Sequence, residues 1–167
     1  MSQTSFWGSK VRQFRAHRRA RVSKDERTAL GGLLTPSQVA LFDRMHVADQ
    51  RHGLDVVSTL RADGIDDEEL LVAGLLHDAG KGQTGLWPRV AFSLGQEYGP
   101  WVWRLAGALP GFRLALDRLR HHAETSAALA AAAGCSARTV ALIRHQDAPR
   151  VGDGEAGERL RLADEAN

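Results

Sequence analysis

The sequence predicts an all-α protein, a compact helical array behind a basic N-terminal segment. Helix-start signals recur along the chain, and apolar residues repeat at helical spacing. β-branched residues are few and scattered, without the alternation of period two that strands show. A chain of 167 residues that is 43% hydrophobic and 25% charged is long enough to bury one core. We therefore expect helices throughout and no sheet.

The basic N-terminal segment, residues 1–35, should precede a single domain over residues 36–167. Residues 1–27 hold eight Lys and Arg against two Asp and Glu, a net +6, so the remainder carries −4 within the overall +2. Trp7, Val11 and Phe14 form an apolar stripe at helical spacing, which favours a helix packed on the domain. The charge leaves open an arm that steers an anionic substrate or touches nucleic acid, or a transit-type peptide.

The first helices of the domain have recognisable start and stop signals. Thr35 and Gln38 form a capping box, with a proline in the first turn, so a helix should run through Met45. The next helix should cover residues 52–62 and end at the Asp-Gly pair that finishes with Gly64.

A buried helix should follow directly. Asp66 can cap it, with Glu69 three residues later, and the apolar residues 70–76 should carry it to His77. Glycines then break the chain. Two short helices are expected before the Pro-Gly pair at 110–111, separated by a Gly-Pro pair at 99–100. Further helices are expected over residues 113–120, 124–133 and 136–145, and from Glu155 onward.

Membrane spans and disulfides are not predicted. No window approaches the roughly 18 uninterrupted apolar residues of a membrane helix. The single Cys135 excludes an intramolecular disulfide and indicates a reducing compartment, so we expect a cytoplasmic protein. Cys135 itself is expected to be a small core residue.

The pair His77-Asp78, at the end of the apolar residues 70–76, is the most informative part of the chain. A His-Asp dipeptide alone is close to chance in a chain with seven histidines. Here an apolar run precedes it and Gly80-Lys81 follows. Two polar groups at the end of a buried helix are costly unless something binds them, and a cation is the obvious candidate. Imidazole together with carboxylate suits Mn, Fe, Zn or Ni.

Four more candidate ligands lie on predicted inner faces of helices. His52, His122, His145 and Asp164 each lie one helical turn from a small or apolar residue. A single histidine on an apolar face is more often a satisfied core residue than a ligand, so their order along the chain has to decide. His46 competes with His52 for the place of the first histidine.

In this order the candidates resemble the ligand pattern of the HD-domain phosphohydrolase superfamily, over roughly residues 50–167. The matching segments are Arg-His-Gly-Leu at His52, Leu-Leu-His-Asp with Gly-Lys at His77, His-Ala-Glu at His122, Ile-Arg-His-Gln at His145 and Leu-Ala-Asp at Asp164. The first, second and last groups match the residues that define the family. The two between them are similar to the extra histidines of its two-metal members. Ala79 departs from the Ile or Val common there, and the interval from His52 to His77 is about one turn short.

The resemblance implies an HD-domain helical array and a metal-dependent phosphohydrolase. One or two divalent ions (Fe, Mn, Zn, Ni or Mg) would activate a hydroxide that cleaves a phosphoester or phosphoanhydride of a small, nucleotide-type substrate. Lys81 would meet a substrate phosphate as a point charge, or cap the helix end, and would act with Asp78 in catalysis. The metal ligands would be His52, His77, Asp78 and Asp164 for one ion, with His122 and His145 for a second ion that Asp78 bridges.

Two other classes of function remain open. A catalytically inactive HD-type domain would bind a nucleotide as a sensor, although the presence of all six ligands argues against it. An interaction module would use the basic segment to bind nucleic acid. Trp87, Trp101 and Trp103 are either core and groove residues or stack a base, and Glu124 is either a surface acid or orients a ligand. The sequence leaves the oligomeric state open.

Overall fold

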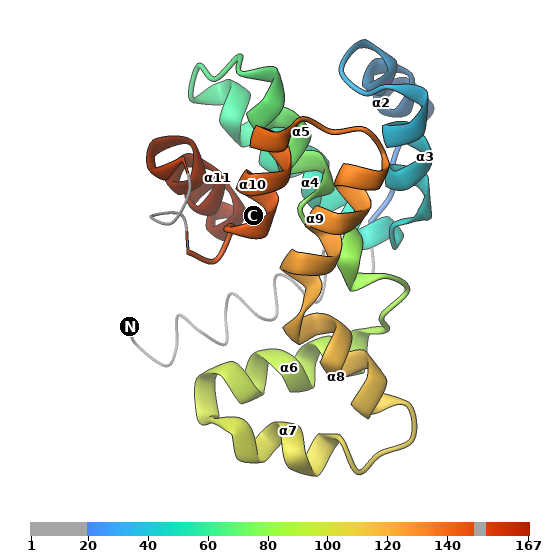
Figure 1. Cartoon of the computed structure of the whole chain (residues 1–167). Coiled ribbons are helices and arrows are strands. Elements are labelled where there is room, and N and C mark those ends of the chain that lie inside the picture. Colours follow the sequence, from blue (N-terminus) through green and yellow to red (C-terminus); the bar gives the residue numbers. More distant parts are fainter. Residues whose placement is uncertain (1–19, 149–152) are drawn as a thin grey trace.

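The structure, a computed structural model, describes residues 20–148 and 153–167, and all regular elements within them are helices (Figure 1). This confirms the predicted all-α class. The helix predicted around Trp7, Val11 and Phe14 lies outside the described residues. In chain order the elements are α2 (Lys24–Ala29), η1 (Leu30–Gly32), α3 (Pro36–Arg44), α4 (Val47–Ala62), α5 (Glu68–Leu76), η2 (Ala79–Lys81), α6 (Leu86–Tyr98), α7 (Pro100–Ala106), α8 (Phe112–Arg120), α9 (His122–Ala132), α10 (Ala137–Arg144) and α11 (Gly154–Ala166).

The predicted helix starts at α3 and α10 are confirmed. The hydroxyl of Thr35 accepts the Gln38 amide, and the Gln38 side chain accepts the Thr35 amide at 2.9 Å, so the capping box closes. The Ser136 hydroxyl accepts the amide of Thr139 at 3.1 Å and starts α10.

Two other predicted starts are wrong. Asp67, not Asp66, caps α5, because its carboxylate reaches the amides of Glu69 and Leu70. The helix expected from residue 52 begins at Val47, because Nδ1 of His46 accepts the amide of Ala48 at 3.2 Å. An imidazole is an uncommon helix cap, and this is why the longer helix escaped prediction.

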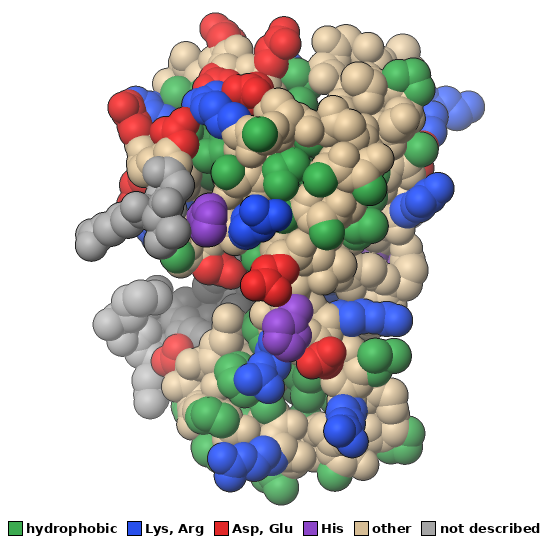
Figure 2. All heavy atoms as spheres, viewed as in Figure 1, with side chains coloured by type: hydrophobic (Ala, Val, Ile, Leu, Met, Phe, Trp, Pro, Cys, Tyr) green, Lys and Arg blue, Asp and Glu red, His purple; other side chains and the backbone are tan. Residues whose placement is uncertain are grey.

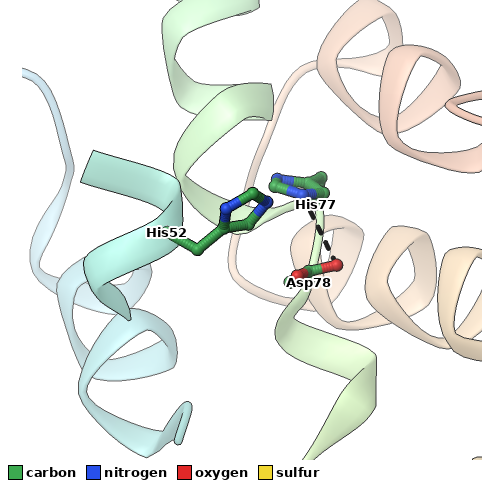
Figure 3. A group of neighbouring side chains, drawn as sticks. All are labelled: His52, His77 and Asp78. Carbon is green, nitrogen blue, oxygen red and sulfur yellow. Dashed lines mark ion pairs between the residues drawn. The ribbon is translucent and has the colours of Figure 1, made fainter. Parts of the chain in front are cut away.

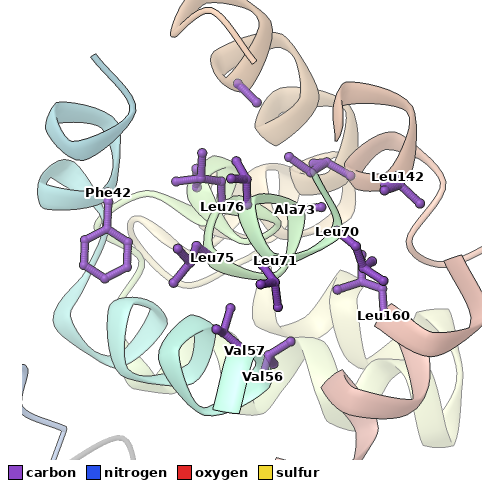
Figure 4. Packing of buried hydrophobic residues seen from close by; sticks show 14 of the residues in the cluster. Phe42, Val56, Val57, Leu70, Leu71, Ala73, Leu75, Leu76, Leu142 and Leu160 are labelled. Carbon is purple, nitrogen blue, oxygen red and sulfur yellow. The ribbon is translucent and has the colours of Figure 1, made fainter. Parts of the chain in front are cut away.

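Helix α5 is the centre of the core. Each of its residues from 70 to 76 is buried, and a helix that is apolar on all sides needs neighbours all round. Figure 4 shows it enclosed by side chains from the surrounding helices. They include Phe42 of α3, Val56 and Leu60 of α4, Leu142 and Ile143 of α10, and Leu160 of α11.

The described part of the N-terminal segment packs on the domain. Leu30 and Leu34 are each 4% exposed and belong to the core cluster. An ion pair of 2.5 Å between Arg51 and Glu26 ties α2 to α4. Helix α2 has no buried residue of its own, so it is held by its connection and its charges.

Helices α6, α7 and α8 form what we call the α6–α8 lobe, residues 86–120, which lies below the other helices in Figures 1 and 2. The Gly-Pro break between α6 and α7 confirms the prediction of two short helices. The Trp103 indole stacks on Phe92, with ring centroids 5.6 Å apart, and donates to the Phe92 carbonyl at 3.0 Å. Gly95 provides the space, because a side chain there would run into the indole of Trp103.

A buried ion pair joins this lobe to the rest of the protein. The guanidinium of Arg89 in α6 donates two hydrogen bonds, at 2.6 and 2.7 Å, to the carboxylate of Asp49 in α4. Asp49 is only 3% exposed.

Across the described residues, none of the helices combines the length and the apolar character needed to cross a membrane.

Candidate metal centre

His77 and Asp78 lie where α5 stops. His77 is the last residue to continue the helix, because its backbone N–H donates a hydrogen bond to the Ala73 carbonyl, and Asp78 leads the chain into η2. Both side chains are 2% exposed, because the apolar run that ends in them lies in the middle of the core. The pair is therefore buried by its position in the fold.

Gly53 brings His52 to this point. A β-carbon on Gly53 would lie 2.8 Å from the carbonyl oxygen of Leu75, so only glycine lets α4 cross the end of α5 this closely. The neighbouring His52 ring turns toward His77, with ring centroids 5.3 Å apart (Figure 3).

Gly80 makes the corresponding approach on the other side. A β-carbon there would collide with the carbonyl of His122 and lie 2.7 Å from the amide of Ser126. The Gly80 amide instead donates to the Ser126 hydroxyl at 2.8 Å. Segment η2 therefore packs against the start of α9, and Nε2 of His122 comes to 3.8 Å from Oδ1 of Asp78.

Backbone carbonyls orient two of the imidazoles. Nδ1 of His77 lies 2.9 Å from the Gly74 oxygen, and Nδ1 of His122 lies 2.8 Å from the Leu119 oxygen. A carbonyl can only accept, so Nδ1 carries the proton in both rings. When these rings are neutral, Nε2 is unprotonated and its lone pair is available, which is the arrangement that metal-binding histidines use.

The Nε2 atoms converge on two carboxylates. Oδ1 of Asp78 lies 3.4 Å from Nε2 of His77, and Oδ1 of Asp164 lies 3.5 Å from the same nitrogen. Asp164 also accepts from Nε2 of His52 at 2.6 Å. We call these five side chains, His52, His77, Asp78, His122 and Asp164, the His/Asp cluster.

The cluster fits a divalent cation. His52, His77 and Asp78 each offer a ligand atom within 4.8 Å of the others. Nε2 of His77 and Oδ1 of Asp78 are buried and have no hydrogen-bond partner among the described residues, which costs about 1–3 kcal/mol for each group. Two nitrogen or oxygen ligands of one ion, each about 2 Å from it, lie about 3 Å apart. The spacing and the donor types therefore suit a transition metal.

Electrostatics also favour a positive charge at this point. Burial opposes the charge on His77, but the carboxylates of Asp78 and Asp164 outweigh it and raise the pKa of His77 to about 9. Burial likewise opposes ionisation of both acids. The nearby histidines, with Lys81 for Asp78, nevertheless hold the pKa of each carboxyl well below its usual range. His122 differs, because burial and the charge of Lys81 lower its pKa and keep it a neutral donor.

Lys81 is paired within the site. Its Nζ lies 2.6 Å from Oδ2 of Asp78, and its side chain is 23% exposed. Burial opposes its charge, but Asp78 and Asp49 outweigh it and raise the pKa of Lys81. The ammonium thus occupies one oxygen of Asp78 and leaves Oδ1 to face the histidines.

The structure brings together five of the six predicted ligands. His145 is half-buried at the end of α10, and no hydrogen bond or ion pair joins its side chain to the cluster within the described residues. Its role as a ligand stays a prediction. His46 caps α4, while His52 lies at the cluster. Glu124 is exposed in the first turn of α9.

Some residues that support the site were not predicted. Gln146 is buried and donates to the His77 carbonyl at 3.2 Å, so α10 supports the cluster through the residue after His145. Asp49, three residues before His52 on α4, pairs with Arg89 and acts on Lys81. An acid three residues before a candidate ligand, on the same helix face, was the signal available in the sequence for Asp49.

Comparison of this chain with models of known protein families, with curated proteins and with solved structures finds no match. The likeness to the HD superfamily therefore rests on the sequence motifs, and any functional conclusion rests on the geometry of the His/Asp cluster.

Proposed function

We propose that this protein is a metal-dependent phosphohydrolase of the HD type, acting on a small nucleotide-type substrate. One observation supports the proposal above the others. Nε2 of His77 and Oδ1 of Asp78 are buried, lack hydrogen-bond partners among the described residues and face each other at 3.4 Å. A buried pair of polar atoms without hydrogen-bond partners is costly in a protein that binds nothing there.

His52, His77, Asp78 and Asp164 would hold one divalent ion, and His122 with His145 would serve a second that Asp78 bridges. A bound divalent cation supplies a nucleophile at neutral pH and offsets the charge of phosphate oxygens. The Gly74 carbonyl orients His77, and the Leu119 carbonyl orients His122.

Lys81 would serve both Asp78 and the substrate. Its ammonium fixes the rotation of the Asp78 carboxylate by holding Oδ2. Because an ammonium has three protons, it can donate to a phosphate oxygen while it stays bonded to Asp78. The partly exposed end of this side chain gives a small phosphorylated substrate a positive group beside the cluster.

We place the protein in the cytoplasm, because a chain with a single cysteine cannot form an intramolecular disulfide and suits a reducing compartment.

Metal analysis followed by a nucleotide panel tests the proposal. The purified protein should contain a transition metal and hydrolyse at least one phosphoester or phosphoanhydride. Asp78→Ala should lose both properties. Asp117→Asn, which changes an exposed acid of the α6–α8 lobe, is the matched control and should keep both.

Two results would contradict the proposal in different ways. A metal-loaded protein that binds nucleotides without hydrolysing any of them would be a sensor. A protein that takes up no transition metal under any loading condition would make the His/Asp cluster an internal ion-pair network.

A further inference from the structure

The α6–α8 lobe carries most of the exposed large hydrophobic side chains among the described residues. Of nine exposed large hydrophobic side chains, six lie in this lobe, so the exposure is local and not scattered. Leu105 is 67% exposed, Leu114 59% and Trp101 56%. The six are Trp87, Tyr98, Trp101, Leu105, Leu109 and Leu114.

The same lobe presents arginines around a cavity. The cavity, of about 840 Å³, lies between α7 and α8. Arg104 lines it from α7, and Arg113 and Arg120 line it from α8. Asp117 is the only acid in the lining, and Nδ1 of His121 lies 3.4 Å from its carboxylate. The cavity is therefore positively charged.

Among the described arginines without a carboxylate partner, which include Arg44, Arg61 and Arg144, those at the cavity are grouped together. Arg27, Arg51, Arg89, Arg138 and Arg161 each pair with a carboxylate. Within residues 20–148 and 153–167, no ion pair or hydrogen bond holds the guanidinium of Arg104 or Arg113. The guanidinium of Arg120 lies over Trp103, 5.2 Å from the ring centre. Stacking on an aromatic face leaves its N–H edge available for a phosphate.

Arginine and apolar side chains occupy adjacent positions on this surface. Trp101 and Leu105 are four residues apart on α7 and share a face, and Arg104 of the same helix lines the cavity. On α8, the exposed Leu114 lines the cavity directly beside Arg113. Figure 2 shows hydrophobic and basic side chains mingled over this part of the molecule.

We propose that the α6–α8 lobe docks on an anionic lipid surface. The phosphate of a lipid headgroup would enter the cavity between Arg104, Arg113 and Arg120, and the exposed tryptophan and leucines would lie at the boundary of the acyl chains. Amphipathic helices with aromatic and leucine residues on one side and basic residues on the other bind membranes in this way without crossing them. This inference does not depend on the proposed hydrolase activity.

Charge and side-chain type favour this occupant over others. A second copy would bring like-charged arginines together, and the N-terminal residues 1–27 are themselves basic. Nucleic acid would complement the arginines. The leucines would gain little from it, because an aliphatic side chain neither stacks on bases nor pairs with phosphates.

Vesicle flotation with the full-length chain tests the proposal. We expect binding to vesicles of phosphatidylglycerol and phosphatidylcholine, with a blue shift of tryptophan emission, and no binding to phosphatidylcholine alone. An arginine near an anionic surface strengthens binding roughly fivefold, so Arg104→Gln/Arg113→Gln/Arg120→Gln should bind about a hundredfold more weakly. The matched control is Arg44→Gln/Arg61→Gln/Arg144→Gln, which removes the same charge from exposed positions outside the lobe and should bind almost as well as the wild type.

A second variant separates insertion from simple charge attraction. Leu105→Ser/Leu109→Ser/Leu114→Ser keeps every charge and should still weaken binding at least about tenfold and remove the blue shift. Thermal unfolding and circular dichroism show whether each variant is folded. Arg120 stacks on Trp103, so Arg120→Gln could disturb the fold of the lobe. If the triple variant is not folded, the double variant Arg104→Gln/Arg113→Gln, at two exposed positions, tests the same prediction.

Several results would overturn the proposal. One is equal binding by the lobe and control triple variants, which would assign the interaction to the general positive charge or to the N-terminal segment. Another is release from the vesicles by inorganic phosphate at the concentration of the lipid phosphate, which would indicate a site for a small anion. Self-association in light scattering without vesicle binding would indicate a second copy instead.

Discussion

The His/Asp cluster and the α6–α8 lobe handle polar and apolar groups in opposite ways. Around the cluster, His77 and Asp78 are buried, Lys81 holds one oxygen of Asp78, and His52 holds Asp164, while Nε2 of His77 and Oδ1 of Asp78 have no hydrogen-bond partner among the described residues. In the lobe, leucines face solvent and Arg104 and Arg113 lack partners within the described residues. A buried charge requires compensation inside the fold, whereas an exposed one can wait for a ligand. The comparison thus separates an internal binding centre from an external surface.

The largest difference should appear between two arginines of the lobe, one that reaches the buried Asp49 on the helix of His52 and one that faces solvent. Arg89→Leu leaves the buried Asp49 carboxylate without its partner and should lower the free energy of unfolding by about 3–5 kcal/mol. Arg104→Leu should change it by no more than about 0.5 kcal/mol, because this side chain is exposed and unpaired within the described part of the chain. Urea denaturation measures both. Equal losses would mean that the exposed Arg104 contributes as much to stability as the ion pair between Arg89 and Asp49.

Glycines provide the second comparison. Gly80→Ala forces a β-carbon against the backbone of His122 and Ser126, which cannot move aside easily, so we expect a loss of about 3 kcal/mol and of metal binding. Gly95→Ala meets the indole of Trp103, a side chain that can rotate, so the loss should be about 1–2 kcal/mol.

The two glycine variants should also differ in tryptophan fluorescence and in metal content. Gly95→Ala should alter tryptophan fluorescence and preserve metal content, while Gly80→Ala should do the reverse. Loss of metal in both variants would show that the lobe and the cluster do not fold as separable units.

Metal addition should stabilise the folded protein through the His/Asp cluster and not through the α6–α8 lobe. An ion that binds only the folded protein adds about 2.7 kcal/mol at a concentration one hundred times its Kd. Calorimetry should therefore show a higher Tm with Mn²⁺ or Zn²⁺, reversed by a chelator. Asp78→Asn should abolish the shift, while Asp117→Asn should retain it. A shift that survives Asp78→Asn would place the ion elsewhere.

The most gradual effect should be the pH dependence of the metal-free protein. The pKa of His77 is raised to about 9 from 6.5, so its protonation adds stability that is fully present below about pH 6.5 and disappears as pH rises to about 9. The slope contributed by this one group is at most about 1.4 kcal/mol per pH unit. His77→Gln, measured by urea denaturation in a chelator between pH 6.5 and 9, should remove that slope. An unchanged slope would assign the dependence to other groups.

Local signals predicted the helices better than tertiary contacts predicted the site. The capping box at Thr35 and the cap at Ser136 were readable because both partners lie within three residues. His46 escaped because imidazole seldom caps a helix. The order of the candidate ligands indicated which side chains would meet, and the structure brings His52, His77, Asp78, His122 and Asp164 together.

Other parts of the site depend on distances along the chain that no local pattern reports. Arg89 lies 40 residues from Asp49, and Gln146 lies 69 residues from the His77 carbonyl that it contacts. The exposure of Leu105 and Leu114 follows from how α7 and α8 are arranged, which helical spacing alone does not specify. The ligand role expected of His145 depends on the same kind of long-range placement.

The ion pair between Arg89 and Asp49 also fixes the orientation of the α6–α8 lobe relative to α4. Arg89 belongs to α6, and Asp49 lies on the same helix as His52, with both of its oxygens engaged. A rotation of α6 away from α4 would strip a buried carboxylate of its counterion, so the lobe cannot swing freely about its connections. A protein that rests on a surface through this lobe would therefore hold the His/Asp cluster at a fixed distance and orientation from that surface.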